Sequence, residues 1–557
     1  MLKKLVRVMV ITGILLMCAV SFAVSAQPHL SIKSTTPSVV TPGTSAIGMC
    51  ATDKYAFVNY KEWIEVFDIE TDPYNPSYLT KIVVSYDDEG TKPMYSGDIR
   101  IRDNYLFVAA YSKNANTVNC KYIAVYNVSA ISDGENLLPV ATTCKSMDSA
   151  TKENNSILGT ASHEFNLVVG EEKAVALSAL SGLYWFDVSD EAIAEAEANG
   201  TYLPRTKAVA EADALANKIT EANLVGRYSV GCIDGDYLYY TAWNSTKYLE
   251  LFIADASNDD FKVIGTYPIY SSETAANYYT EGLDMYVENN YIYLCSHLPG
   301  NRNTIAIEGT TLQTANGVYI LDVTNTKATG TQEAPVAPSL VTLTTPPGSG
   351  LTNGNSQIGG VALDGDYMYI WGTGSKFQRI YMYDISNRQS PVYMAQTAQL
   401  ATTGSRGDSL HSISAKGDVI YSCATTNGLV VHALTDCTID GITVKKDGEE
   451  INALEQGLLS VEMTATSYAR EQKNVSIILA LYYNDELENI VVSSETIGAY
   501  EKEKLLTASI NVPSADGYRL KAMVWDSIDG MNIKSVVWDD ETAVSTGLDL
   551  VAAAIEQ

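Results

Sequence analysis

Most side chains that can do chemistry in this sequence lie in segments that connect short apolar stretches. Six of them stand out: His163, His297, His411, Arg302, Arg379 and Arg406. An imidazole beside a tyrosine or arginine can act as general acid or base, and a guanidinium can hold a carboxylate in two parallel hydrogen bonds. The group therefore suits lyase or hydrolase chemistry on an acidic sugar. The candidates for catalysis are His163, His297, His411 and Arg302.

The same side chains allow three other interpretations, and the sequence leaves them open. Loop histidines can bond to neighbouring backbone and nothing more. Two or three imidazoles with a carboxylate such as Glu164 or Glu281 can ligate a metal. A loop cluster can also bind a partner without a reaction, and the residues suited to that role are Trp243, Trp371, Arg379 and Arg406. The two tryptophans suit sugar stacking, and they suit packing between sheets equally well.

Familiar enzyme motifs are missing from the sequence. It has no GxSxG elbow, no HExxH pair, no phosphate-cradling loop and no CxxC pair for structural zinc. The segments 234–236 and 364–366 (Asp-Gly-Asp) resemble calcium loops, but Asp-Gly is favoured in hairpin turns because it tolerates positive φ. Arg406-Gly-Asp408 matches a cell-adhesion tripeptide that recurs by chance. We therefore predict no metal and no cofactor, and we favour binding over catalysis.

The elements that must position these loops form an internal repeat. An acidic or glycine turn followed by an alternating strand, usually with tyrosine, recurs seven times. The copies are Asp53–Val58, Asp103–Val108, Glu172–Leu177, Gly235–Tyr240, Asn289–Leu294, Gly365–Ile370 and Gly417–Ser422. Their spacing, about 50 to about 75 residues, is typical of propeller blades with loop insertions.

A second strand phrase follows each copy. Its members are Ile64–Asp68, Ile123–Asn127, Leu183–Asp187, Leu249–Ile253, Val318–Asp322, Ile380–Asp384 and Leu429–His432. Most repeats also have one strand before the turn and one after the second phrase, so each repeat predicts four strands, which make one blade. His432 stands at the position that other copies fill with Asp, and we interpret it as structural.

The last repeat has no evident fourth strand, whereas a strand-like stretch at His29–Lys33 has no repeat of its own. We predict that this stretch completes the last blade and closes a ring, because an open ring exposes two sheet edges. The sequence thus predicts an all-β fold, with a seven-bladed β-propeller over 27–437 followed by an Ig-like β-sandwich over 438–557. An Ala- and Glu-rich stretch at about 190–224 predicts short helices inserted in the third blade.

The repeat resembles the LVIVD repeat of bacterial surface β-propellers. The copy that matches best reads Tyr55–Val58, Ile64–Asp68 and then Asn75–Leu79, whereas copies four and seven depart at the Asp position. The resemblance covers residues of roughly 28 to 436. That family is defined by fold and surface location, so the resemblance implies an architecture and no particular reaction.

The second domain is predicted from alternating strands with short polar turns between them. These strands are Leu458–Ala465, Val475–Tyr482, Leu505–Val512 and Tyr518–Trp525, and their pattern suits an immunoglobulin-like sandwich. The segment Leu520–Met531 is similar to a C-terminal accessory domain of secreted proteins from Clostridia-like bacteria. That domain accompanies enzymes and surface proteins alike, so it indicates a bacterial source and no chemistry.

The first residues predict secretion. Basic residues at Lys3, Lys4 and Arg7 precede the apolar run Val8–Val20, and a small-residue site ends at Ala26, which is the layout of a cleaved signal peptide. The formal charge of −29 becomes −32 when three basic residues leave (−29 − 3). So acidic a chain disfavours nucleic acid and anionic membranes as partners.

Two cysteines are placed for a disulfide. Cys120 lies just before the third strand of the second repeat and Cys144 just after its fourth, and antiparallel neighbours bring such positions together. A disulfide would persist outside the cell. We expect a secreted or cell-surface protein that binds an extracellular protein or polysaccharide, with a carbohydrate-active enzyme on acidic glycans as the alternative.

Overall fold

The computed structural model describes residues 30–539 with gaps. The gaps are 86–93, 112–120, 144–165, 179–181, 201, 204–229, 244–247, 258–260, 272–283, 297–316, 348–356, 374–378, 401–412, 435–436, 452, 469–471, 485 and 526–532. The described chain is mostly β-structure in antiparallel sheets, as the sequence predicts. It divides into two compact units, one over Leu30–Ala433 and one that contains Leu434–Gln557. The predicted boundary at 437 therefore falls a few residues late, because Cys437 already begins a strand of the second unit.

Within its described residues, the first unit contains seven sheets, one for each repeat. Sheet one has β2 (Gly48–Ala51), β3 (Tyr55–Asn59), β4 (Ile64–Asp68) and β5 (Ser77–Ile82). Sheet two has β6 (Tyr95–Arg102), β7 (Tyr105–Tyr111), β8 (Lys121–Asn127) and β9 (Ala141–Thr142). Sheet three has β10 (Asn166–Val169), β11 (Lys173–Ser178) and β12 (Gly182–Asp187). Sheet four has β13 (Gly231–Asp234), β14 (Tyr237–Trp243), β15 (Tyr248–Asp255) and β16 (Lys262–Ser271).

The remaining sheets follow the same order. Sheet five has β17 (Met285–Glu288), β18 (Tyr291–Ser296), β19 (Gly317–Asp322) and β20 (Ser339–Thr344). Sheet six has β21 (Gln357–Asp364), β22 (Tyr367–Thr373), β23 (Arg379–Asp384) and β24 (Val392–Gln396). Sheet seven has β25 (Ile413–Lys416), β26 (Val419–Ala424) and β27 (Gly428–Leu434), and its fourth strand comes from the start of the chain.

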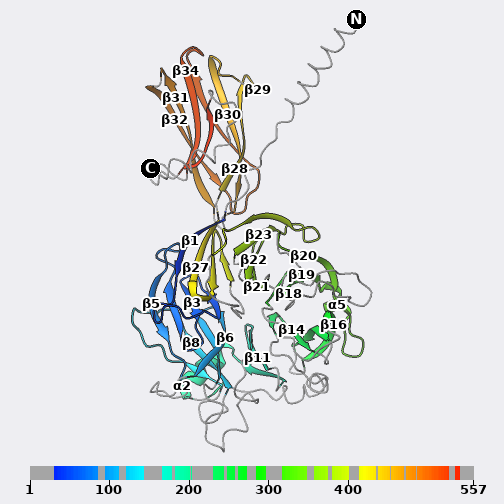
Figure 1. The fold of residues 1–557 in the computed structure, drawn as a ribbon. Coiled ribbons are helices and arrows are strands. Elements are labelled where there is room, and N and C mark those ends of the chain that lie inside the picture. Colours follow the sequence, from blue (N-terminus) through cyan, green and yellow to red (C-terminus); the bar gives the residue numbers. More distant parts are fainter. Residues whose placement is uncertain are drawn as a thin grey trace, which may run out of the picture. The chain divides into compact units, whose positions relative to one another are not determined.

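That fourth strand is β1, Leu30–Thr36, which is hydrogen-bonded to β27 in the order β1-β27-β26-β25. Figure 1 shows the two strands side by side. The predicted pairing of the 29–33 stretch with the last sheet is therefore confirmed. Leu30 is buried there, and the side chain of Ser34 donates a hydrogen bond to the carbonyl of Tyr74 in sheet one at 2.8 Å.

The first strands of the seven sheets contact one another in sequence. β2 contacts β6, β6 contacts β10, and the series continues through β13, β17 and β21 to β25. The first strand of the last sheet, β25, in turn contacts β2 in sheet one. The hydrophobic clusters of this unit join neighbouring sheets, and one of them spans sheets two, three and four. Another joins sheets seven and one through residues such as Val58 and Leu429.

The Asp that ends the second phrase caps the turn after the strand. In six sheets this side chain accepts a hydrogen bond from the backbone N–H two residues on, at 2.8–3.0 Å. The capping residues are Asp68, Asn127, Asp187, Asp255, Asp322 and Asp384. The fourth copy thus keeps its Asp, at Asp255. Its second phrase lies two residues later in the chain than the predicted range Leu249–Ile253, which is a correction to the sequence analysis.

The register also corrects the assignment of His432. Asp68 lies opposite Tyr55 at the start of β3, and the equivalent residue opposite Val419 in sheet seven is Ala433. His432 is therefore one residue before the Asp position. Because neighbouring residues of a strand point to opposite faces, its side chain faces the other way from a capping Asp.

At three junctions a tyrosine of the first phrase connects its sheet to the next one. Its partner lies in the connection between the third and fourth strands of the following sheet. The hydroxyl of Tyr55 accepts from Ile131 N, that of Tyr293 accepts from Arg388 Nε, and that of Tyr421 donates to the Pro73 carbonyl, all at 2.9–3.1 Å. The last of these joins sheet seven to sheet one, so this junction uses the same type of contact as the internal ones.

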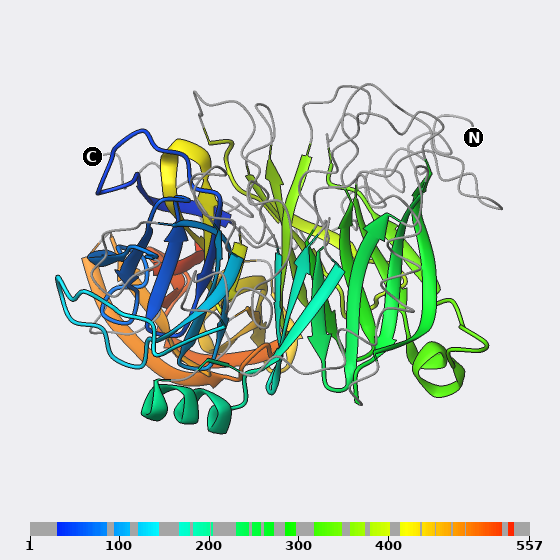
Figure 2. The ribbon, with the colours of Figure 1, turned by 90° about the horizontal axis from the view of Figure 1, so that it is seen from below.

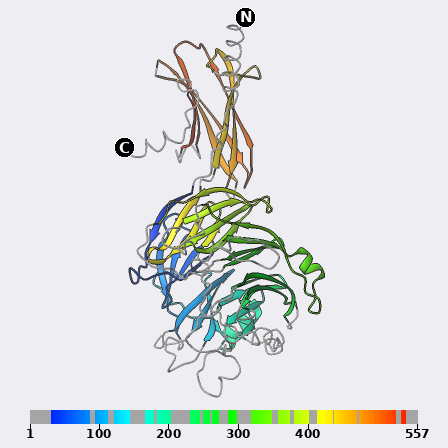
Figure 3. The ribbon, with the colours of Figure 1, turned by 45° about the vertical axis from the view of Figure 1, so that its right-hand side comes forward.

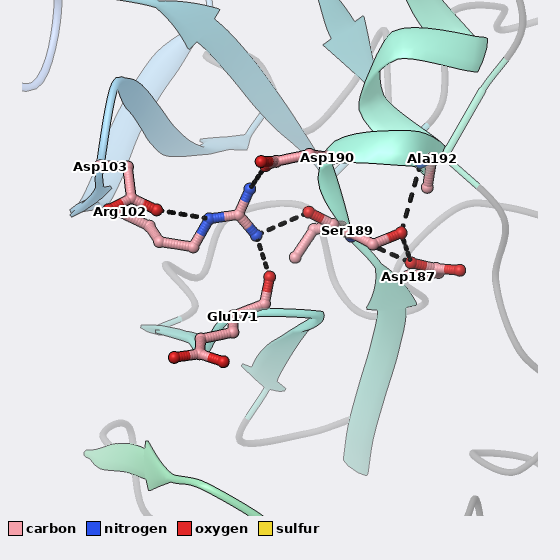
Figure 4. A network of polar contacts seen from close by, with 8 residues as sticks. Arg102, Asp103, Glu171, Asp187, Ser189, Asp190 and Ala192 are labelled. Carbon is pink, nitrogen blue, oxygen red and sulfur yellow. Dashed lines mark hydrogen bonds and ion pairs between the residues drawn. The ribbon is translucent and has the colours of Figure 1, made fainter.

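Helix α2 (Asp190–Asn199) occupies the start of the predicted helical insertion, and residues 204–224 lie outside the described ranges. Ser189 caps it, since its side chain accepts from Ala192 N. Figure 4 shows how Arg102 of sheet two holds this end of the helix: its guanidinium donates to the Val188 carbonyl at 2.6 Å and pairs with Asp190 at 2.8 Å. Figure 2 shows α2 in teal and α5 (Thr324–Thr329) in green, both outside the sheets.

The described residues of the second unit form two antiparallel sheets that share one core, drawn in orange and red in Figure 3. One sheet has β29 (Glu449–Glu450), β28 (Cys437–Lys446), β30 (Gly457–Ser467) and β33 (Lys504–Val512) in that order. The other has β32 (Glu486–Ile497), β31 (Lys473–Tyr483), β34 (Tyr518–Trp525) and β35 (Ile533–Asp539). Alternate residues of each strand face the core, which is why the period-two pattern predicted these strands.

In the part of the chain that the structure describes, no helix has the length and apolarity needed to cross a membrane.

Candidate functional site

Most of the candidate residues for chemistry lie outside the described ranges. These are His163, His297, His411, Arg302 and Arg406, together with both members of the predicted disulfide, Cys120 and Cys144. The described strands next to the three histidines are β10, β18 and β25. The predictions that involve these residues stay predictions.

The two tryptophans and the third arginine fall on described strands. Trp371 is 1 % exposed, so it packs inside the unit and the predicted sugar-stacking role for it is wrong. Trp243 ends β14, and its side chain lies outside the described set. Arg379 begins β23, is half-buried and donates a hydrogen bond to the side chain of Gln399 at 3.2 Å.

Trp371 packs against His432, with 6.2 Å between ring centroids. His432 is fully buried, and its Nε2 is hydrogen-bonded to the hydroxyl of Ser422 at 2.8 Å. Neither His432 Nδ1 nor Trp371 Nε1 has a hydrogen-bond partner among the described residues. Burial lowers the pKa of His432 to about 3, because an imidazolium ion would lose its hydration there. His432 is therefore a neutral packing residue at physiological pH, which agrees with its interpretation as structural.

The lowered pKa of His432 predicts that the folded protein loses stability in mild acid. His432 takes up a proton near pH 6.5 in the unfolded chain, but only near pH 3 in the folded protein. Between these two pH values the unfolded state binds more protons than the folded state. The free energy of unfolding therefore decreases as the pH is lowered from 7 toward 3. The contribution amounts to about 2 kcal/mol between pH 7 and pH 5. We expect that His432→Phe removes this part of the pH dependence when denaturant midpoints are compared at pH 7 and pH 5. Parallel pH profiles of the two proteins would contradict the assignment.

The described residues that are best organised for binding lie in the turn between β3 and β4. Lys61 has a φ of 70°, a conformation that is uncommon for a residue other than glycine. Its N–H donates to the side-chain oxygen of Asn59 at 2.8 Å, and its carbonyl accepts from the N–H of Ser96 at 2.7 Å and from the Ser96 hydroxyl at 3.1 Å. Asn59 and Ser96 are both buried, and Asn59 also donates to the Gly97 carbonyl in sheet two. The backbone of Lys61 is thus fixed across the junction of two sheets.

The ammonium group of Lys61 lies over two aromatic rings. Its Nζ is 4.9 Å from the ring centre of Tyr95 and 5.9 Å from that of Tyr111, and the two tyrosine ring centres are 5.5 Å apart. Tyr111 is buried, whereas Tyr95 and Lys61 are half-buried and keep part of their surface open. Cation–π attraction of this kind stabilises the position of the ammonium by about 0.5–1 kcal/mol for each contact. We call Lys61, Tyr95 and Tyr111 the lysine–tyrosine site.

A buried carboxylate supports the same turn. Glu65 is 0 % exposed and accepts hydrogen bonds from the Ser38 hydroxyl at 2.6 Å and from the indole N–H of Trp63 at 3.1 Å. It also accepts from the backbone N–H groups of Val39 and Val40. Four donors satisfy this carboxylate, so it fixes the segment that follows β1 against the β3–β4 turn.

The first strand of each sheet has one residue that pairs with the same position of the second strand. In sheet one this position is Phe57, and its partner is Cys50. The equivalent partners in the seven sheets are Cys50, Arg100, Val168, Cys232, Tyr286, Ala362 and Ser414. Burial raises the pKa of both thiols, and the guanidinium of Arg100 opposes this rise for Cys50 in sheet one and Cys232 in sheet four alike. Both thiols are protonated and poor nucleophiles.

Within the described ranges, no three His, Cys, Asp or Glu side chains gather in a way that could hold a metal ion. At the lysine–tyrosine site a lysine ammonium lies over the rings of two tyrosines, at the junction of sheets one and two. Sequence reasoning missed it, because a lone lysine in a turn carries no signal. Only the contacts that Asn59 and Ser96 make across two sheets identify it.

Comparisons with known proteins give little further information. No family model matches the chain, and no curated protein matches it. Among solved structures, a calcium-binding mutant of Bacteroides uniformis β-glucuronidase 2 is similar over 19 % of this chain and 14 % of its own, with 13 % identity and a TM-score of 0.15. The exo-β-1,3-galactanase of Phanerochaete chrysosporium is similar over 82 % of this chain and 96 % of its own, with 11 % identity and a TM-score of 0.27. The first likeness spans a small part of that enzyme, and neither carries an argument about this chain.

Proposed function

We propose that this chain is a secreted or cell-surface protein in which a seven-bladed β-propeller of the LVIVD type carries an Ig-like sandwich. The seven sheets, the series of contacts that leads from β25 back to β2, and the fourth strand that β1 adds to the last sheet all support a ring. The contact from Tyr421 to Pro73 supports it too, since it repeats an internal junction. The basic, apolar and small-residue order of residues 3–26 supports export through a cleaved signal peptide.

The function that follows is binding of an extracellular protein or polysaccharide without a reaction. The lysine–tyrosine site is the observation that carries it, because Lys61 is held in an uncommon backbone conformation by buried groups of two sheets. Such a conformation costs about 1–3 kcal/mol, and conformations of this kind cluster at sites that bind ligands. The site lies at the strand ends from which the 60–63 turn extends, where connections between blades provide a binding surface in propellers.

A binding panel tests this proposal. The mature chain is incubated with insoluble and soluble cell-wall polysaccharides and with an extracellular protein fraction, and bound material is quantified while absorbance is followed for unsaturated sugar products. We expect retention of one class of partner with no new product. Failure to retain any partner would contradict the proposal.

Product release would favour the alternative, an enzyme that cleaves acidic glycans with His163, His297, His411 and Arg302. His297→Ala is the diagnostic variant, because loss of product with binding intact assigns a reaction to that loop. Binding that is unchanged in this variant, with no product from either protein, supports binding alone.

A further inference from the structure

The strand β32 of the second unit has an open edge within the described residues. It is hydrogen-bonded to β31 on one side, and no described strand pairs with its other side. A bulge next to Asn489 interrupts the pairing with β31, so the regular stretch of β32 is Asn489–Ile497. This stretch contains neither lysine nor proline, the residues that often protect a sheet edge. In contrast, the outermost strand β29 of the other sheet has only two residues, both glutamates.

The face of β32 that points away from the core is apolar beside this edge. Ile490 and Val492 are 51 % and 42 % exposed. Val492 lies opposite Ile478 of β31, which lies opposite Met523 of β34, so an apolar stripe crosses three strands and ends at the edge. Val491 lies on the other face and packs against the core of the unit. The edge therefore offers aliphatic side chains as well as backbone groups.

Two identical strands can pair at such an edge through a two-fold axis normal to the sheet. This axis makes the strands antiparallel and keeps each face on its own side, so a residue pairs only with a residue of the same face. In the register centred on Val491, Ile490 of each copy lies opposite Val492 of the other. Asn489 then lies opposite Ser493, so no carboxylate lies opposite another in this stretch.

The neighbouring registers match less well. A register centred on Ile490 places Val492 opposite Glu488, and one centred on Val492 places Ile490 opposite Ser494. Only the register centred on Val491 pairs both exposed aliphatic residues with each other, and it continues the apolar stripe from one copy into the next. The exposed face and the symmetry of the strand thus select the same arrangement.

We propose that β32 pairs with β32 of a second copy of this chain, so that the two β32-β31-β34-β35 sheets become one continuous sheet. A second copy supplies the matching aliphatic pair by symmetry, whereas a strand of another protein needs a fitting sequence of its own. The inference goes beyond the proposed binding function. A dimer carries two copies of the first unit, which raises the avidity for a polymeric partner without a new contact.

The pairing is weak and depends on salt. An interface of one strand pair lies below about 1,200 Å², the size of transient complexes, so we expect a dissociation constant in the micromolar range or above. Each copy is strongly acidic, with a formal charge of −29 for the whole chain. Added salt screens the repulsion between the copies, so dimerisation of the parent chain should strengthen as salt rises.

Sedimentation of the chain from Gln27, measured over a range of concentrations, tests the pairing. We expect the parent chain to dimerise. Val492→Lys should weaken dimerisation about tenfold or more, because it places an ammonium group opposite Ile490 in both halves of the interface. The matched control is Leu458→Lys, since Leu458 is 65 % exposed on β30, an inner strand of the other sheet. Both positions are exposed, so the denaturant midpoints of the variants should equal that of the parent chain.

A double variant tests the register. Ile490→Glu combined with Val492→Lys places a carboxylate opposite an ammonium group at both pairs of the register centred on Val491. Dimerisation should therefore return, and it should now weaken as salt rises. In either neighbouring register the same variant places two carboxylates or two ammonium groups opposite each other, so it should not dimerise there.

Three results overturn the inference. A parent chain that stays monomeric at every concentration rejects self-pairing, even if its edge accepts a strand of another protein. A dimer that Val492→Lys leaves intact has its interface elsewhere, and a dimer that the double variant does not restore has another register. The binding panel is scored separately, because retention of a partner by Val492→Lys keeps the proposed function whether or not the parent chain dimerises.

Discussion

A chain that begins at Pro37 is expected to lose most of its stability and to self-associate. This truncation removes β1, which is the fourth strand of sheet seven and buries Leu30. Burial of one such leucine is worth about 1.5–3 kcal/mol, and the strand adds its hydrogen bonds to β27. The loss exposes the edge of β27, and an exposed, regular edge pairs with other chains. Denaturant midpoints and size-exclusion chromatography measure the two effects.

The control is a chain that begins at Gln27, which keeps β1 and lacks only the predicted leader. A synthetic peptide of residues 27–38, added to the truncated chain, should restore part of the lost stability by strand addition. A truncated chain with the same midpoint as the control, and monomeric at the same concentration, would show that β1 does not hold the unit together.

Glu65→Leu is expected to destabilise the first unit by about 3 kcal/mol. The substitution leaves four donors without their acceptor, among them the Ser38 hydroxyl and the Trp63 indole, in a place where the side chain is 0 % exposed. The segment after β1 should then loosen, which faster proteolysis near residue 39 would detect. Equilibrium unfolding in denaturant gives the free energy.

Two variants control for the loss of charge. Glu65→Gln keeps one side-chain oxygen as an acceptor, so its cost should be smaller than that of leucine. Glu70→Leu removes an exposed carboxylate whose ion pair with Lys54 is 4.0 Å long, and it should change stability by less than about 0.5 kcal/mol. Equal losses at positions 65 and 70 would refute the buried role of Glu65.

The sequence predicted the strands well because each strand satisfies a local pattern that repeats. The first phrase falls on the second strand of every sheet, and β1 was identified because it lacked a repeat of its own. The fourth copy was misaligned because Leu249–Ala254 is largely apolar, so the residue opposite Tyr237 could not be read from alternation. The register shows that this residue is Asp255, which caps its turn like the others.

The candidate site was harder to predict, because its parts are far apart in the sequence. Asn59 and Ser96 belong to different repeats and meet only when sheets one and two pack. Nothing in the pattern distinguishes Lys61 from other lysines in turns, since its positive φ is a property of the folded backbone. Trp371 was misjudged for a related reason, because an alternating strand does not say whether a tryptophan faces solvent or the next sheet.

The pairing of β1 with β27 also determines when folding can finish. Ribosomes make β1 among the first elements of the unit and its partner last, so the sheet that contains both cannot form until nearly the whole unit exists. Contacts between such distant segments are slow to form, because the intervening chain must first be brought together. Until then β1 is an unpaired strand that neighbouring chains can capture. We therefore expect the yield of this protein to rise when the newly made N-terminal segment is protected, for example by a chaperone.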